Sequence, residues 1–517
     1  MDEPANEVAP RPVEIYDTRT GQTPTLEPIE PGKVKMYVCG VTVYDLTHIG
    51  HARVYVFFDV VQRFFRYLGY DVTHVRNHTD VDDKIIDRAQ EEGEDPLELA
   101  EHYIDEFKSD MDRLRVEDPD YEPRVSECVD DVIRMVETLE EKGYAYEVDG
   151  DVFYRVEEFD DYGKLSKRDL DEMEAGRSGR TDEEIEQKKE HPFDFTLWKS
   201  SEPGEPSWES PWGEGRPGWH IECSVMSTKY LGPRFDIHGG GSDLIFPHHE
   251  NEIAQSEAAS GANPLANYWM HMGMVNVAEE NEEGEIVEEK MSKSLGNFWT
   301  TRDVLDQFHP DAIRYFLLST HYRKPITYSV ERLEEATDRV EYLYATRERI
   351  EETLDHAGYS DPSDIDGKGE LVSGTEEVVN GFLPKFEEAL ADDFNTSKAL
   401  ATIDELAKLG NELAESPEPV DDDRAYTLFL VENHLAKAAG DVLGFLEQTP
   451  ADALREIREI QLADLDITVE QIEEKIAARK EARENEAYQV ADEIRDELAD
   501  AGIEIMDKAW GTIWRVE

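Results

Sequence analysis

The chain has 517 residues, with 120 acidic against 53 basic side chains and a formal net charge of −67. That length allows roughly three or four domains, and no apolar run is long enough to span a bilayer, so we expect no membrane association. The three cysteines and the acidic first residues argue against a disulfide framework and a secretory signal, and predict a reducing, cytoplasmic location.

The acidic residues are distributed along the whole chain and are not gathered in one tail. Carboxylates in this number hold water and ions at a surface, so the composition predicts adaptation to a cytosol of very high salt, as in halophilic archaea. At about 1 M salt the screening length is about 3 Å, which blunts self-repulsion. Disorder is the alternative for acidic runs, but the steady supply of apolar and aromatic residues disfavours it for most of the chain.

A strand, a helix and a second strand are predicted near the N-terminus. Residues 34–38 form a short apolar run, residues 52–68 carry apolar side chains at helical spacing, and residues 70–75 have the pattern of a strand. This order is a βαβ unit, whose crossover is right-handed and whose sheet is parallel. We therefore predict an α/β fold with a Rossmann-like parallel-sheet catalytic domain, in which ligands lie beyond the carboxyl ends of the strands.

The turn before that helix reads His48-Ile49-Gly50-His51. The N-terminus of a helix offers N–H groups and a positive dipole to a phosphate. Gly50 would let a nucleotide approach the backbone, and His48 and His51 can donate to phosphate oxygens. A turn in which both histidines are bonded internally is the alternative that these residues leave open.

A second motif, Lys290-Met291-Ser292-Lys293-Ser294, lies far along the chain. Its two lysines suit a leaving pyrophosphate, whose charge grows in the transition state. A solvated basic turn is the alternative, although the run follows acidic residues 279–289, which we predict to be a loop. Together the two motifs resemble, without a substitution, the His-Ile-Gly-His and Lys-Met-Ser-Lys-Ser signatures of class I aminoacyl-tRNA synthetases.

Two cysteines, a histidine and a glutamate form a candidate metal set: Cys39, Cys223, His248 and Glu252. Pro247 suits the first position of a helix, on which His248 and Glu252 share a face while His249 points elsewhere. Two thiolates, an imidazole and a carboxylate are suitable zinc ligands. Spacing alone favours the alternative, in which the cysteines are small buried hydrophobes, because the four residues are scattered along the chain.

From about residue 14 to the C-terminus, these blocks resemble the cysteinyl-tRNA synthetase family. The resemblance implies that the candidate set binds one zinc ion per chain, which takes the thiolate of the substrate and so rejects serine. It implies two steps: L-cysteine and ATP with Mg²⁺ form cysteinyl adenylate, and the 3′-terminal adenosine of cysteine tRNA then accepts the cysteinyl group. It also implies a monomer without a separate editing site.

The resemblance further assigns a substrate pocket and a nucleotide site. Thr79 lies near the substrate, and Trp219 and His238 pack around the cysteine side chain. Asp243 takes the ammonium group. The residues expected at the nucleotide are Gly40, His48, Gly50, His51, Gly239, Gly240 and Lys293, with His48, His51, Lys290 and Lys293 as the catalytic group. Without the resemblance, Trp219 reads as core, Thr79 as a helix N-cap and Asp243 as a turn residue.

The domains that the resemblance implies follow in chain order. They are two Rossmann halves at 14–127 and 215–289, an insertion at 128–214 that contacts the tRNA acceptor end, a stem-contact region at 290–330, a helical bundle at 331–450 and an anticodon-binding domain at 451–517. Residues 198–219, rich in Pro, Gly and Trp, are predicted to be the linker returning from the insertion.

The last domain is predicted to contain two helices over residues 472–499 and a hairpin over residues 503–514. Candidates for tRNA contact there are Arg479, Arg483, Trp510, Trp514 and Arg515. Core packing is the favoured alternative for the tryptophans, and a solvated helix face is an equal alternative for the arginines.

Three other functions are compatible with parts of the pattern. A ligase that passes cysteine to the amine of a small sugar, as in mycothiol biosynthesis, shares the zinc and adenylate chemistry but lacks the C-terminal unit. An RNA-binding or regulatory protein with an inactive core is disfavoured by the complete lysine motif and metal set. A cytidylyltransferase also uses a His-x-Gly-His turn but does not require the metal set.

Overall fold

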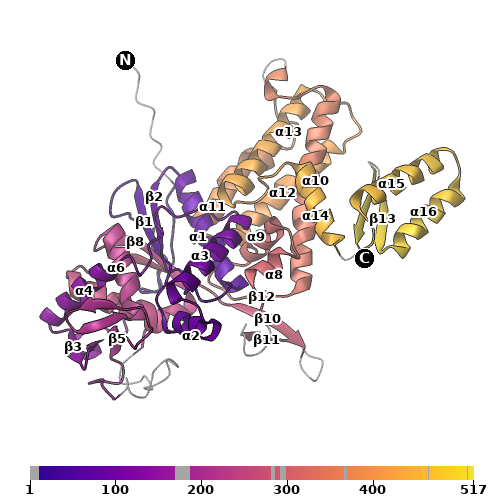
Figure 1. Ribbon diagram of the computed structural model, residues 1–517. Helices are drawn as coiled ribbons and strands as arrows, with labels where there is room; N and C mark the ends of the chain where they lie inside the picture. Colours follow the sequence, from indigo (N-terminus) through magenta and orange to yellow (C-terminus); the bar gives the residue numbers. More distant parts are fainter. Residues whose placement is uncertain are drawn as a thin grey trace, which may run out of the picture. The chain divides into compact units, whose positions relative to one another are not determined.

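The computed structural model describes residues 11–168, 187–280, 286–290, 298–365, 369–463, 465–508 and 511–516. The chain forms two compact units (Figure 1). The first unit contains Met1–Arg302, Leu317–Tyr328 and Glu388–Ser397, and the second contains Asp303–Phe316, Ser329–Glu387 and Lys398–Glu517. Within the described residues, no helix has the length and apolar character needed to cross a membrane.

A four-stranded parallel sheet forms the centre of the first unit. Its strands run in the order β2-β1-β8-β9, and their bounds are Asp71–Arg76, Lys33–Val38, Phe235–Gly241 and Ala266–Met272. Strands β1 and β2 pair along their full length, with Lys33 opposite Asp71. The predicted βαβ unit and parallel sheet are therefore confirmed.

Helix α1 (Ile49–Tyr67) crosses from β1 to β2 and begins three residues before the predicted start. Most of its apolar side chains, including those of Phe58 and Phe64, are buried. A Cβ atom on Gly239 would lie 2.2 Å from the ring of Phe58, a distance far shorter than any allowed carbon contact. Glycine at this point of β8 is therefore required for the close approach of α1.

The region between the two halves of this sheet folds into helix α4 (Val129–Glu141) and a five-stranded antiparallel sheet of order β3-β4-β5-β7-β6. The strands are Ala145–Val148, Asp151–Tyr154, Phe195–Ser200, Gly213–Pro217 and Trp208–Ser210. The predicted linker over 198–219 is wrong, because β5, β6 and β7 occupy much of it. The reason is visible at Trp198, which is completely buried and pairs with Pro217 across two strands.

The other helices of the first unit are α2 (Asp83–Glu92), α3 (Pro96–Arg113), α6 (Trp219–Leu231) and α7 (Glu250–Ser260). A third sheet has the order β11-β10-β12, with bounds Ile286–Lys290, Val275–Glu280 and Ile326–Tyr328. The prediction of a loop over 279–289 is therefore wrong in part, because the consecutive residues Ile286–Lys290 pair with β10. Lys290 ends β11, and Met291–Asn297 lie outside the described residues.

Helices make up most of the chain after residue 300, as predicted. They are α8 (Thr301–Leu305), α9 (Pro310–Leu318), α10 (Val330–Ala357), α11 (Glu376–Ala391), α12 (Thr396–Ala414), α13 (Asp422–Leu435) and α14 (Pro450–Gln461). The last residues form α15 (Val469–Glu484), α16 (Tyr488–Asp500) and an antiparallel hairpin of β13 (Ile503–Lys508) with β14 (Gly511–Val516). The two predicted C-terminal helices and the hairpin are confirmed.

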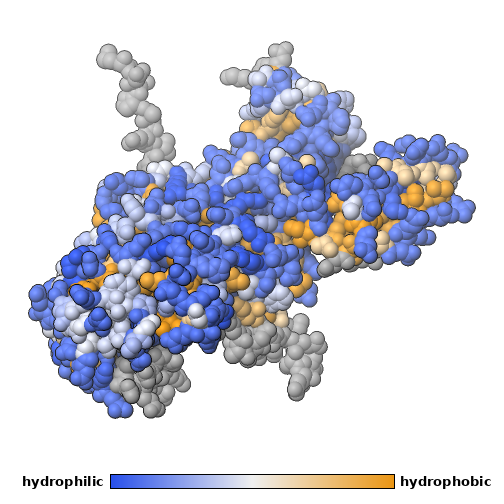
Figure 2. Space-filling view, in the orientation of Figure 1, coloured by the Kyte–Doolittle hydropathy of each residue, from blue (hydrophilic) through white to orange (hydrophobic). Residues whose placement is uncertain are grey.

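Hydrophilic residues cover most of the visible face in Figure 2. This is the surface expected from 120 acidic residues among 517. Many apolar residues form buried clusters, such as the one of Leu498, Ile503 and Trp514 between α16 and the C-terminal hairpin, although some apolar surface remains visible over the C-terminal part in Figure 2.

Candidate active site

Four residues that are far apart in the sequence meet at the carboxyl end of the parallel sheet. Cys39 directly follows β1 and Cys223 lies on α6. His248 lies in the π-helical turn Ile245–His249 that leads into α7, and Glu252 lies in the first turn of α7. One ligand atom from each residue lies within 4.8 Å of every other, and all four residues are buried. These are the four residues predicted as metal ligands, although metal binding itself stays a prediction.

The separations among these atoms fit a four-coordinate ion of the size of zinc. The Sγ atoms of Cys39 and Cys223 are 3.8 Å apart, and two sulfurs at tetrahedral angles with bonds of about 2.3 Å are separated by about 3.8 Å. The Sγ of Cys39 lies 3.5 Å from Oε1 of Glu252, and Nε2 of His248 lies 3.1 Å from the same oxygen. With bonds of about 2.0–2.3 Å, the corresponding edges are about 3.3–3.5 Å.

The four groups shift one another's protonation. A hydrogen bond from Cys39, with further help from His248, lowers the pKa of Cys223 to about 6 against the effect of burial. Burial raises the pKa of Cys39, and the neighbouring Cys223 raises it further. Burial acts to lower the pKa of His248, but Cys223 and Glu252 raise it to about 10. The cluster therefore favours a thiolate at Cys223 beside an imidazolium at His248. A metal cation could take the place of the imidazolium proton.

The prediction that His249 points away from the cluster is wrong. Its Nε2 lies 3.2 Å from Sγ of Cys39, and its Nδ1 lies 2.8 Å from Nε2 of His271. The extended backbone of Phe246 (φ −140°, ψ 131°) interrupts the helix here, so the side-chain directions of a regular helix do not apply. Cys39, His238, His249 and Glu252 consequently form a second buried set within the same 4.8 Å limit.

His271 and Asn77 also lie near the cluster, although no motif in the sequence marks them. Nδ1 of His271 lies 2.8 Å from Oγ1 of Thr18, which extends the contact from His249 to the N-terminal segment. Asn77 accepts from the backbone N–H of Gly40 at 2.8 Å, and its Oδ1 lies 3.7 Å from Sγ of Cys223. The available signal was positional, because both residues lie at the carboxyl ends of strands in the same sheet.

The predicted pocket residues lie at different depths around the cluster. Nε2 of His238 is 2.8 Å from Oε2 of Glu252, and the ring centroid of Trp219 is 4.4 Å from that of His248. Thr79 is buried and donates to Oε2 of Glu222 at 3.1 Å. Asp243 is exposed, on the turn between β8 and α7. The substrate roles of these residues stay predictions.

His48 is the N-cap of α1, and His51, in the first turn of the helix, completes a capping box with it. Nδ1 of His48 accepts from the N–H of Gly50 at 3.0 Å, and Nδ1 of His51 accepts from the N–H of His48 at 3.4 Å. Their rings are stacked, with centroids 3.9 Å apart. An imidazole that accepts at Nδ1 carries its proton on Nε2 when it is neutral. In this cap, the hydrogen-bond donor of each neutral histidine ring is therefore its Nε2–H group.

The glycines predicted to approach a nucleotide are also explained by packing inside the protein. A Cβ on Gly40 would lie 1.5 Å from the carbonyl oxygen of Asn77, and one on Gly50 would lie 2.7 Å from Cε1 of His48. One on Gly240 would lie 3.0 Å from Cε1 of His249. Contact between these glycines and a nucleotide stays a prediction, as does the role of Lys293, which lies outside the described residues.

Comparison with known proteins identifies the family. Residues 25–338 match the family described as tRNA synthetases class I (C) catalytic domain, and residues 385–447 match the DALR domain. The chain is 47% identical to the cysteine–tRNA ligase of Geotalea daltonii, an alignment that covers 97% of this chain and 99% of that protein. This chain belongs to the cysteine–tRNA ligase family. It is also 48% identical to the Geobacter metallireducens member, with 97% and 99% of the two chains covered.

Membership of this class I family confirms the resemblance drawn from the two sequence motifs. A solved structure, that of Mycobacterium tuberculosis methionyl-tRNA synthetase with methionyl-adenylate, superposes with a TM-score of 0.59 at 18% identity, covering 82% of this chain and 93% of the other. This likeness shows a shared fold, and it confirms the α/β class with a parallel-sheet catalytic domain.

Proposed function

We propose that this protein attaches L-cysteine to cysteine tRNA in two ATP-dependent steps. The observation that carries the proposal is the buried cluster of Cys39, Cys223, His248 and Glu252 at the carboxyl end of the sheet, close to the turn that begins α1. Full-length similarity to cysteine–tRNA ligases supports the choice of cysteine and tRNA as substrates.

Zinc is the proposed ion, held by Cys39, Cys223, His248 and Glu252. A zinc ion bound there supplies a soft Lewis-acid centre that prefers a thiolate to a neutral hydroxyl, and this preference distinguishes cysteine from serine. We favour this set over the one with His238 and His249 because it contains both cysteines. In addition, His238 is already within hydrogen-bond distance of Glu252. His238 would then orient the carboxylate of Glu252.

The remaining pocket residues would hold the amino acid. Trp219 lies against His248 and would cover the side chain of the substrate, with Thr79 behind it. Asp243 would bind the ammonium group, for which an exposed carboxylate at the mouth of the site is well placed. No side chain need act as a nucleophile, because the carboxylate of cysteine attacks the α-phosphate itself.

Adenylate formation would depend on positioning and charge stabilisation. His48 and His51 would donate from Nε2 to phosphate oxygens at the N-terminus of α1, where the helix dipole also favours an anion. ATP would bind with Mg²⁺ against Gly40, Gly50, Gly239 and Gly240. Lys290 and Lys293 would stabilise the leaving pyrophosphate.

The same proposal assigns the other parts of the chain. Residues 14–127 and 215–289 would form the catalytic domain, residues 128–214 would contact the acceptor end, and residues 290–330 the stem. Residues 331–450 would form the bundle, and residues 451–517 would bind the anticodon. We also propose that the protein acts as a monomer in the cytoplasm of a halophilic organism.

The first experiment is charging of total tRNA from a halophilic archaeon by the purified protein, with ATP and molar KCl, offering cysteine and serine separately. Charging with cysteine alone supports the proposal. Adenylate formation without charging would instead favour the ligase that acts on a small sugar. A folded, metal-loaded protein without either activity would indicate an inactive synthetase core.

A further inference from the structure

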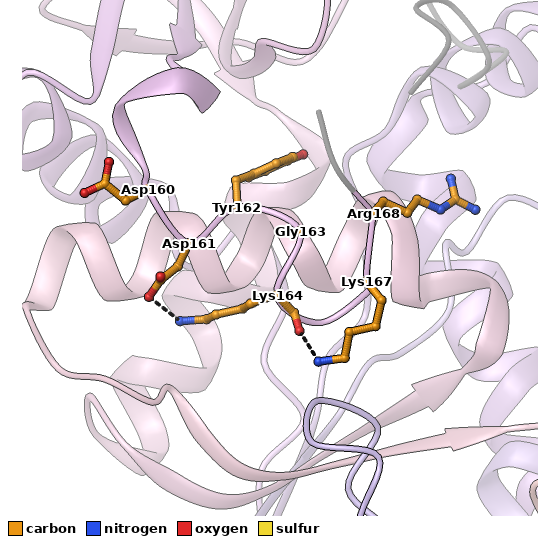
Figure 3. A pocket seen from close by; sticks show the side chains of 7 residues that line it. All are labelled: Asp160, Asp161, Tyr162, Gly163, Lys164, Lys167 and Arg168. Atoms are coloured by element: carbon orange, nitrogen blue, oxygen red, sulfur yellow. Dashed lines mark hydrogen bonds and ion pairs between the residues drawn. The ribbon is translucent and has the colours of Figure 1, made fainter. Parts of the chain in front are cut away.

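A short loop of the insertion carries three basic side chains in a strongly acidic protein. Lys164, Lys167 and Arg168 fall within five residues, whereas acidic residues outnumber basic ones by 120 to 53 in the chain as a whole. The loop borders an open cavity of about 520 Å³ (Figure 3). The residues that line this cavity are Asp160, Asp161, Tyr162, Gly163, Lys164, Lys167 and Arg168.

Contacts with α7 fix this loop to the helix that carries Glu252. The backbone N–H groups of Leu165 and Ser166 donate to the carboxylate of Glu250, at 3.2 Å and 2.7 Å. The hydroxyl of Tyr162 donates to Oδ1 of Asn251. Both acceptors are buried and lie directly before Glu252 in the sequence. The loop is therefore held beside the metal cluster by neutral and charge-assisted hydrogen bonds.

The three cations of the loop differ in how they are neutralised. Lys164 forms an ion pair with Glu257, and Asp161 lies 3.8 Å away. Lys167 and Arg168 are exposed, and neither forms an ion pair with any carboxylate in the described part of the chain. Nζ of Lys167 donates instead to the carbonyl oxygens of Arg19 and of Lys164, the latter at 2.9 Å.

Arg168 is held over an aromatic ring at the edge of the site. Its guanidinium carbon is 4.7 Å from the ring centroid of Phe246, two residues before His248. When a guanidinium stacks on an aromatic ring, the N–H groups at its edge point away from the ring. Two of these N–H groups can then donate to two oxygens of one phosphate. In Figure 3 the side chains of Lys167 and Arg168 extend from neighbouring positions of the same loop.

We propose that Lys167 and Arg168 bind phosphates of the tRNA acceptor end and so guide the terminal adenosine toward the site. This inference rests on the proposed function, and it names the residues of the insertion that recognise the RNA. A protein with a net charge of −67 repels a polyanion at most of its surface. Positive charges that have no carboxylate partner among the described residues, and that are held beside the candidate site by contacts with α7, offset this repulsion where the RNA would enter.

Removal of one phosphate contact has two measurable effects on RNA binding. The affinity falls, and the slope of log affinity against log salt becomes shallower by about 0.7 to 0.9 per lost contact. Formation of cysteinyl adenylate requires no tRNA, so it should not change. These two readouts separate an RNA contact from a structural role of the loop.

The test compares Arg168→Gln and the double variant Lys167→Gln/Arg168→Gln with the wild-type protein. We measure pyrophosphate exchange with cysteine, charging kinetics, and tRNA affinity across a range of KCl concentrations. For the double variant we expect unchanged exchange, a KM for tRNA raised about tenfold, and a salt slope that is shallower by about 1.5. The charge-conserving variant Lys167→Arg/Arg168→Lys should restore most of the affinity.

Lys33→Gln is the matched control. Lys33 is an exposed lysine paired with Glu30 at the amino end of β1. Its substitution therefore removes one positive charge at the opposite end of the strands. Suppose that the wild-type protein charges tRNA and that Arg168→Gln has the same KM and salt slope as the wild type. This result would overturn the inference and leave the proposed function intact. Equal losses of exchange and charging would overturn it in favour of a structural loop. A wild-type protein that does not charge tRNA would overturn both.

Discussion

At the scale of single residues, the candidate site depends on which side chains are present and on how the backbone directs them. Cys39, Cys223, His248 and Glu252 could be selected by residue type and family resemblance, and they lie together in the fold. His249 could not, because its direction depends on the extended conformation of Phe246, which a periodicity rule does not represent. Burial and neighbouring charge also decide the pKa values of the cluster, and neither is visible before the chain is folded.

Replacing Cys223 by serine should remove both the bound metal and the preference for cysteine over serine. A neutral hydroxyl is a poor ligand for zinc, and the tetrahedral set then lacks one of its two sulfurs. Metal content of the purified protein is the primary measurement, and charging with each amino acid is the second. Cys128→Ser is the control, since that thiol is also buried but lies 3.4 Å from Nζ of Lys229, outside the cluster. Full metal content in Cys223→Ser would rule out this ligand assignment.

Gly239→Ala should destabilise the first unit by about 1–3 kcal/mol, because the new methyl group overlaps the ring of Phe58. Gly381→Ala is the control: its Cβ would lie 3.7 Å from Cε of Lys385, an ordinary contact on helix α11. There the added methyl group should be neutral or stabilise the helix by about 0.5–1 kcal/mol. Thermal unfolding of both variants checks this. Equal melting temperatures for Gly239→Ala and the wild type would refute the packing argument.

At the scale of elements, strongly periodic segments were predictable and weakly periodic ones were not. The first strand, α1 and the C-terminal hairpin all follow from their apolar patterns. The Pro, Gly and Trp in residues 198–219 favour a linker, yet the pairing of β5 with β4 and with β7 overrides that preference. Residues 286–290 are a similar case. Their acidic composition predicts a loop, but they pair with β10 and form β11.

Asp507 joins the C-terminal hairpin to α15. Asp507 accepts from both Arg479 and Arg483, and contact between these two arginines and tRNA stays a prediction. Trp514 is buried beside Ile503, which confirms core packing for this tryptophan. Trp510 and the side chain of Arg515 lie outside the described residues.

Asp507→Asn should weaken the docking of this hairpin, by roughly 1 kcal/mol at most because the carboxylate is partly exposed and screened by solvent. The hydrogen bond from Arg479 holds the pKa of Asp507 well below its usual range. The stabilisation is therefore present above the unfolded value of about 3.9 and is lost as the pH falls below it. Hydrogen exchange of β13 amides at pH 7 and at lower pH measures the effect. Asp500→Asn, at the end of α16, is the control for a general change of charge.

At the scale of the whole molecule, net charge is the dominant property. Repulsion among 120 carboxylates acts over a distance set by the ionic strength. The screening length falls from about 10 Å at 0.1 M salt to about 3 Å at 1 M. The folded state concentrates these charges on a smaller surface than the unfolded chain does, so salt should favour folding.

The melting temperature should therefore rise steadily between 0.1 M and 2 M KCl, and a small part of the gain should be lost when a few surface charges are removed. A variant with several exposed glutamates replaced by glutamine, for example Glu334, Glu335, Glu412 and Glu474, tests this against the wild type. Calorimetry at each salt concentration is the measurement. A melting temperature independent of KCl would remove the argument for a high-salt cytosol.

The position of Cys39 and Cys223 on opposite sides of the insertion has one more consequence. Their sulfurs meet although 184 residues separate them in the chain. An ion that bridges them closes a loop of that length, and a closure of this size costs an unfolded chain about 5 kcal/mol of entropy. The folded chain has already lost that entropy before any ion arrives. We therefore expect the metal to bind late in folding. The rate of metal binding would then report when the chain after the insertion has joined the parallel sheet and brought Cys223 next to Cys39.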